Sequence, residues 1–240
     1  MYAGIGALWT IFPLMIFGVR FWPQVFAPAA FSILFGPWVG GVGAAIGIFL
    51  ADVIYGHHDV LLSLLVGVPS NFIGFFVIGW LTNHEWKGVA RRVLVLVSLL
   101  IQPIYAVALV FGLYFLFGAA TIGSSTSYLG LVGLVVVLAI IFLIIVRNKW
   151  ADFEVAASIG LAIGTGIIGL GIVVYSAIFG LPVAVGLGTK PLGTAFVYLV
   201  AASSYFTEIP FMVILTPPVA AACRAAFPSL RVIEPATQKH

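Results

Sequence analysis

The chain has 240 residues, of which 63% are hydrophobic and only 7% are charged. Soluble domains carry roughly a quarter charged residues, so this composition excludes a soluble enzyme, a nucleic-acid-binding module and a disordered protein. The net charge of +3 comes from ten basic and seven acidic residues, and the basic ones lie mostly in short loops between apolar segments. The sequence therefore predicts an all-α, polytopic helical membrane bundle in the cell membrane.

The predicted spans number about eight, with six as the lower limit, because about 20 apolar residues are needed to cross a bilayer. Phe35-Gly36-Pro37 separates the short second segment from the third. Since proline disfavours helix at and just before its own position, this tripeptide predicts a tight reversal; the alternative is one long bent helix. In chain order the segments are Gly4–Val19, Trp22–Phe35, Pro37–Tyr55, Leu61–Leu81, Val93–Phe117, Tyr128–Val146, Val155–Phe179 and Gly193–Leu215.

Loop charges predict the orientation of these spans. The loops Thr82–Arg92 and Arg147–Glu154 carry several basic residues, as does the C-terminal tail, whereas Gly56–Val60 and Gly118–Ser127 carry none. Because cytoplasmic loops are enriched in Lys and Arg, both termini are predicted to be cytoplasmic. Residues 1–216 then form a single transmembrane domain, and residues 217–240 form a cytoplasmic tail.

Polar residues inside the spans are few, and on three spans they lie beside or near prolines. Two acids fall in spans, Asp52 near an outer end and Glu208 at greater depth, two positions before Pro210. A buried charge is costly in a bilayer, so such residues face the bundle interior or a cavity. Asn71 and Gln102 also stand next to or near prolines, and amides in hydrocarbon need hydrogen-bond partners. Together these residues predict one hydrated cavity, although each amide alone also suits a helix–helix contact.

Other features leave two interpretations open. Tyr105 and Tyr205 could stack on a planar ligand or simply pack against other helices. Adjacent His57 and His58 are weak metal candidates, because neighbouring histidines do not share a helical face and no third ligand is evident; no metal or cofactor is expected. Glycine stripes, one from Gly36 to Ala51 and one around Gly160 and Gly164, favour close packing inside the chain over docking of a membrane partner.

Catalytic motifs are missing from the sequence. There is no Gly-x-Ser-x-Gly, no His-Glu-x-x-His and no phosphate-binding Gly-x-x-x-x-Gly-Lys-Ser/Thr. The chain is therefore not expected to be an enzyme, and if it moves a solute with ATP, another chain must hydrolyse the nucleotide.

Three segments resemble the S components of energy-coupling-factor transporters, the substrate-binding membrane subunits of vitamin and metal importers. They are Ala29–Gly40, which continues through Gly43 and Gly47 to Asp52, then Val68–Gly79 and Ile214–Ala221. The resemblance implies capture of a small solute from outside, followed by release through a transmembrane coupling subunit and two cytosolic ATPases. It also implies that small residues of the first helix, here Ala3 and Ala7, contact the coupling subunit. That family usually has six spans, whereas eight segments are counted here.

The leading hypothesis from the sequence is a non-enzymatic solute-binding subunit of such an importer, surrounded by membrane lipid and without a nucleic-acid partner. Its expected polar pocket contacts are Asn71, Gln102 and Glu208, and Asp52, His57 and His58 are expected near the entrance, with Tyr105 and Tyr205 as aromatic contacts. One alternative is a stand-alone secondary transporter that uses Glu208 as a proton site. A weaker alternative is a membrane-embedded enzyme.

Overall fold

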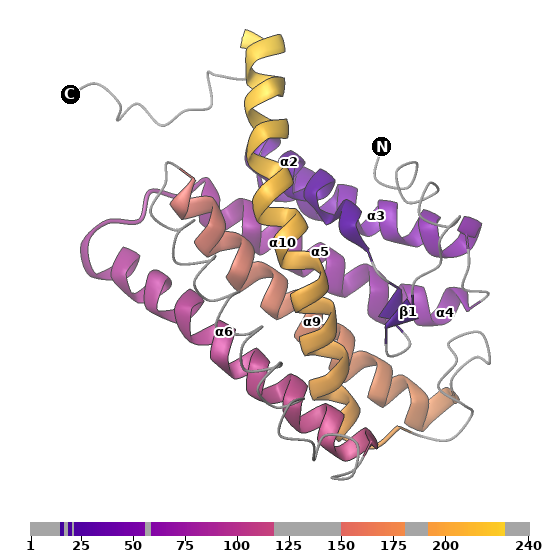
Figure 1. Ribbon diagram of the computed structural model, residues 1–240. Helices are drawn as coiled ribbons and strands as arrows, with labels where there is room; N and C mark the ends of the chain where they lie inside the picture. Colours follow the sequence, from indigo (N-terminus) through magenta and orange to yellow (C-terminus); the bar gives the residue numbers. More distant parts are fainter. Residues whose placement is uncertain are drawn as a thin grey trace.

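The computed structural model describes residues 15–16, 19–20, 22–55, 59–117, 150–180 and 192–228. Within these ranges the chain is a bundle of helices (Figure 1). Five helical segments are long and apolar enough to cross a bilayer, as expected for a multi-pass membrane protein: Pro37–Ile54, Val60–Thr82, Gly88–Phe115, Ala151–Phe179 and Ala195–Ala226. The helical membrane fold that the sequence predicts is confirmed for the described part of the chain.

The described residues near the N-terminus form two short strands. β1 (Met15–Ile16) pairs with β2 (Val19–Arg20) in antiparallel register, with Met15 opposite Arg20. The sequence predicted a helical span as far as Val19, which is wrong for these residues. The preceding Pro13 cannot donate to a helical ladder, and the β-branched Ile16 and Val19 suit paired strands.

The predicted reversal at Gly36 is confirmed. A short 3₁₀ turn, η1 (Pro23–Val25), leads into α2 (Phe26–Phe35), and α3 (Pro37–Tyr55) begins directly after Gly36. Gly36 has a φ of 89°, a left-handed conformation that glycine adopts without strain. The two helices then pack so closely that a Cβ atom on Gly40 would lie 2.7 Å from the Cα atom of Ser32.

The next span is built from three consecutive helical pieces, α4 (Val60–Leu62), the π-helical η2 (Ser63–Gly67) and α5 (Val68–Thr82). Asp59 caps its start, because its Oδ1 atom accepts from the backbone N–H of Leu62 at 3.0 Å. At the other end, the Asn83 side chain donates to the carbonyls of Gly79 and Ser32 at 2.7 and 2.9 Å. Asn83 thereby ties the end of α5 to α2.

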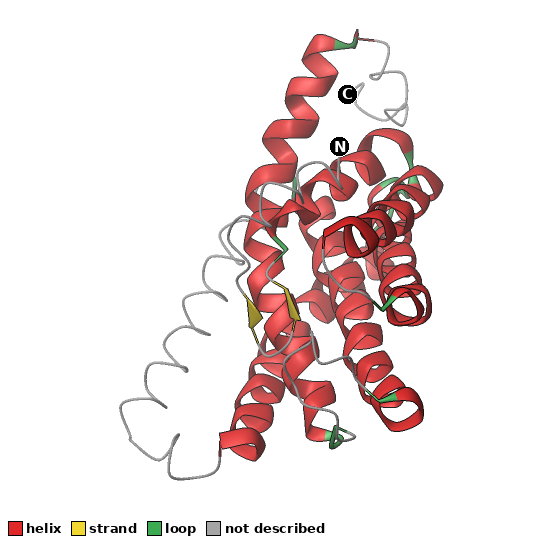
Figure 2. Ribbon diagram, turned by 90° about the vertical axis from the view of Figure 1, so that its right-hand side faces the viewer, coloured by secondary structure: helices red, strands yellow, loops and turns green. Residues whose placement is uncertain are grey.

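Glycines allow α5 to pack directly on α9 (Ala151–Phe179). A Cβ atom on Gly160 would lie 2.7 Å from the carbonyl oxygen of Gly74, and one on Gly164 would lie 3.2 Å from the carbonyl oxygen of Ser70. Small residues permit such close backbone contact between membrane helices. The glycine stripe on α9 therefore packs inside the chain, and α9 becomes the most enclosed of the long helices, with α5, α6 and α10 packed against it. Figure 2 shows the described helices side by side in the bundle.

α6 (Gly88–Phe117) and α10 (Ala195–Ala226) complete the described bundle. α10 crosses the other helices, and its C-terminal end projects beyond them (Figure 1). It remains helical through Pro217 and Pro218, so the boundary at residue 216 that the sequence suggested lies inside this helix. Prolines are tolerated in membrane helices when neighbouring groups bond the carbonyls that they leave unpaired.

The starts of α6 and α9 lie together, which fixes the direction of both helices. Arg91 forms an exposed ion pair with Asp152, with 2.9 Å between Nη2 and Oδ1. α6 and α9 therefore run parallel, and Phe117 and Trp150 lie at opposite ends of the bundle. The predicted span Tyr128–Val146 falls outside the described residues. Assignment of the Arg91 end to the cytoplasm remains a prediction from the loop charges.

Candidate functional site

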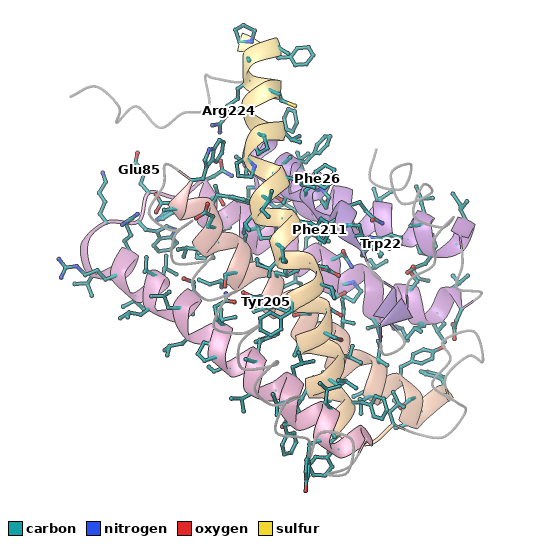
Figure 3. All side chains as sticks on the ribbon, in the orientation of Figure 1. Trp22, Phe26, Glu85, Tyr205, Phe211 and Arg224 are labelled. Carbon is teal, nitrogen blue, oxygen red and sulfur yellow. The ribbon has the colours of Figure 1, made fainter. Side chains whose placement is uncertain are left out.

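A buried polar network joins three helices at the centre of the bundle. Gln102 on α6 donates from Nε2 to the Tyr205 hydroxyl of α10 at 2.6 Å and to Ser158 Oγ of α9 at 3.2 Å. Ser158 Oγ and Tyr205 Oη lie 2.8 Å apart. Figure 3 shows Tyr205 on the side of α10 that faces α6. All three side chains are buried. Because buried groups in a membrane protein cannot bond to water, these side chains depend on one another for hydrogen bonds.

Tyr105 extends this network along α9. Its hydroxyl donates to the carbonyl of Ala162 at 2.5 Å, and Thr165 Oγ1 lies 3.4 Å from the same hydroxyl. The Tyr105 and Tyr205 rings are 4.7 Å apart between centroids. The structure thus brings Gln102, Tyr105 and Tyr205 together, and it satisfies their polar groups with one another and with α9.

A separate small cavity lies where α5, α9 and α10 meet. Its volume is about 20 Å³, which is room for about one water molecule. Among the described residues of its wall, Glu208 is the only ionisable one. Asn71 and Glu208, which the sequence placed in one pocket, both line this cavity, whereas Gln102 does not, although Thr165 touches both the cavity and the network. The described residues that line it are Ser70, Asn71, Gly74, Phe75, Ile78, Gly160, Leu161, Gly164, Thr165, Ile168 and Glu208.

Glu208 is the least satisfied polar group of this site. Its side chain is buried, with 8% of the residue's surface exposed, and it has no hydrogen bond or ion pair to any residue that the structure describes. Pro210, two positions on, interrupts the helical ladder and leaves the Phe206 carbonyl without its usual N–H donor. A buried carboxyl without a partner is costly, so its presence needs a functional reason.

The other polar side chains described in the cavity wall each donate a hydrogen bond to a backbone carbonyl. Ser70 Oγ and Asn71 Nδ2 both donate to the carbonyl of Gly67, each at 2.9 Å. Thr165 Oγ1 donates to the carbonyl of Leu161 at 2.9 Å. The wall therefore presents mainly oxygen lone pairs to whatever enters the cavity.

Asp52 lies apart from the cavity, in a polar cluster near the start of the α4–α5 span. Its Oδ2 atom accepts from Ser63 Oγ at 2.7 Å. Nearby in sequence, Asp59 accepts from the Tyr175 hydroxyl at 2.7 Å, which joins the α4 cap to α9. Asp52 is not among the described residues that line the cavity, although its Oδ2 atom would lie 3.3 Å from a Cβ atom on Gly67, whose carbonyl accepts from Asn71.

The remaining predicted site residues, Ala3, Ala7, His57 and His58, lie outside the described residues. Across the described ranges, no three His, Cys, Asp or Glu side chains are grouped closely enough to hold a metal ion.

Two site residues escaped the sequence analysis, Ser158 and Thr165, because single hydroxyl residues are common in membrane helices. A helical-face argument could have found them. Ser158 and Thr165 are seven positions apart and share one face of α9, while Ser98 and Gln102 are four apart on α6. The Ser158 hydroxyl lies 3.5 Å from the Ser98 carbonyl, so these two faces meet.

Comparison of the chain with protein-family models, curated proteins and solved structures found no match.

Proposed function

We propose that this chain is the solute-binding membrane subunit of an energy-coupling-factor type importer, not an enzyme, and that it resides in the cell membrane. The observation that carries this proposal is the cavity where Asn71 of α5 and Glu208 of α10 meet inside an apolar bundle. Binding pockets for small molecules are mostly apolar, with a few placed polar groups. This cavity has that composition.

The arrangement of the segments that resemble S components supports the proposal. The short α2, the reversal at Gly36 and the glycine-containing α3 follow one another as that resemblance implies, and α5 carries Asn71 into the cavity wall. Since the sequence holds no nucleotide-binding motif, the proposed assembly also contains a transmembrane coupling subunit and two cytosolic ATPases.

A vitamin-sized solute requires this cavity to widen. A volume of about 20 Å³ accommodates about one water molecule, so α5 or α10 must move away from α9 when the solute enters. The proposed capture step is therefore a separation of helices around Glu208.

The test is purification of the tagged chain from the membranes of its own host. Co-purification of two ATPases and a membrane subunit, together with ATP-dependent uptake by the reconstituted assembly, is the expected result. Uptake by the isolated chain in liposomes, without any ATPase, would contradict the proposal.

The second candidate function is a stand-alone proton-coupled transporter. The specific observation in its favour is Glu208, which is the only ionisable group among the described residues of the cavity wall and has no partner in the described structure. Such a carboxyl can carry a proton across a hydrophobic region. It predicts that an imposed pH gradient drives uptake by the purified chain alone and that Glu208→Gln abolishes this uptake.

A further inference from the structure

Glu208 is the only group that can carry a negative charge among the described residues of the cavity wall, and no described lysine, arginine or histidine lines that wall. An ionised carboxylate in a low-dielectric interior needs a positive partner. Within the described residues, the chain supplies none to Glu208. The ionised form of Glu208 therefore requires a positive partner from outside this part of the chain.

The neighbouring polar groups also favour a ligand group that donates hydrogen bonds over one that only accepts them. The hydroxyl hydrogens of Ser70 and Thr165 point to backbone carbonyls of their own helices, and Asn71 gives one amide hydrogen to Gly67. A ligand group that enters here meets hydroxyl oxygens and the Glu208 carboxyl. An anionic or purely accepting group would face these lone pairs with few hydrogens available to it.

From this juxtaposition we propose that the solute carries a protonated nitrogen group, such as an amine or amidine, which pairs with the Glu208 carboxylate inside the cavity. The inference rests on the proposed solute-binding function and adds the chemical class of the ligand. An amidine-type group donates two parallel N–H bonds to a carboxylate, which gives charge pairing and orientation together. The apolar wall formed by Phe75, Ile78 and Ile168 then contacts the remainder of the solute.

The experiment uses acetamidinium and acetamide as probes, because they have the same heavy-atom shape but only the first is charged. The full chain is reconstituted in lipid nanodiscs, and its thermal unfolding midpoint is followed by tryptophan fluorescence while each probe is titrated. A ligand that binds only the folded state raises this midpoint in a saturable manner. Acetamidinium is expected to do so at least tenfold more strongly than acetamide or than potassium chloride at equal ionic strength.

Two variants locate the effect. Glu208→Gln should weaken the acetamidinium response roughly 10- to 100-fold, because it removes hydrogen bonds to a charged group. Asp152→Asn, which removes an exposed carboxylate from the Arg91 end of α9, should leave the response unchanged. An equal response to acetamide and acetamidinium in the unaltered chain would overturn the proposal, as would an acetamidinium response that survives Glu208→Gln.

A third result distinguishes the proposed ligand class from the proposed solute-binding function. If the solute that co-purifies with the chain is neutral or anionic, yet its binding still depends on Asn71 and Glu208, the ligand class proposed here is wrong while the solute-binding function stands. If no solute is retained and no acetamidinium response occurs, both proposals fail.

Discussion

The polar network around Tyr205 and the cavity around Glu208 lie side by side but differ in how their polar groups are satisfied. In the network, Gln102, Ser158 and Tyr205 hydrogen-bond one another across three helices. In the cavity, Glu208 has no partner among the described residues although it too is buried. Buried polar residues that lie only a few helical turns apart are thus of two kinds, those that hydrogen-bond one another and one that has no partner among the described residues.

The two regions are expected to serve different properties, the network the stability of the fold and the cavity the binding of a solute. A network whose hydrogen bonds are all internal holds α6, α9 and α10 in register and contributes to the folded state. A carboxyl that is buried without a partner contributes nothing comparable and destabilises the fold when it is charged. We therefore expect changes in the network to alter stability and changes in the cavity to alter binding.

The largest effect is expected for Tyr205→Ala. Removal of a fully buried aromatic ring costs about 3–5 kcal/mol in unfolding free energy, and it also leaves Gln102 and Ser158 without a shared partner. Denaturation with SDS in mixed micelles measures this change. Tyr205→Phe is the matched control, since it keeps the ring and loses about 0.6–2 kcal/mol of interhelical hydrogen bonding. Equal losses in the two variants would show that the ring does not pack in this core.

A smaller loss is expected for Gly160→Ala, at the contact between α5 and α9. The added methyl would lie 2.7 Å from the Gly74 carbonyl oxygen, and this overpacking costs about 1–3 kcal/mol. The same denaturation assay measures it. Gly43→Ala is the control, because no atom lies within 4 Å of a Cβ placed there. If both substitutions cost the same, the close approach of α5 and α9 is wrong.

The smallest change in stability is expected for Glu208→Gln. The amide keeps the shape of the side chain and cannot ionise, so the unfolding free energy should stay within about 0.5 kcal/mol of the unaltered value or rise. Gln102→Leu, on the network side of the comparison, should lower it by about 1 kcal/mol. If Glu208→Gln lowered the unfolding free energy by more than Gln102→Leu does, the carboxyl would have a structural partner, and the difference between the network and the cavity would not hold.

The sequence predicted the elements that depend on local chemistry. The pair Gly36-Pro37 predicted the reversal between α2 and α3. Glycine adopts a positive φ without strain, and proline suits the start of a helix. The same local reasoning failed at residues 15–20, where hydrophobicity suggested a span and the chain pairs as strands. The sequence also placed the end of the transmembrane domain at residue 216, whereas α10 continues to Ala226.

The site was predicted less completely, because it depends on which helix faces meet. Prolines near Asn71, Gln102 and Glu208 drew attention to these positions, but spacing along one chain segment cannot show which of them share a cavity. Gln102 lies in the network, and Asn71 and Glu208 line the cavity. Gly74 packs against Gly160 and Gly164 and so brings α5, which carries Asn71, to α9. This packing between helices separates the cavity from the network.

The most direct test of the account is native mass spectrometry of the full chain released from lipid nanodiscs, compared with Glu208→Gln prepared in the same way. We predict that the unaltered chain retains a small molecule in a one-to-one complex and that the variant is folded but empty. Identical spectra, with the same molecule retained in both or none in either, would contradict the claim that Glu208 holds a solute.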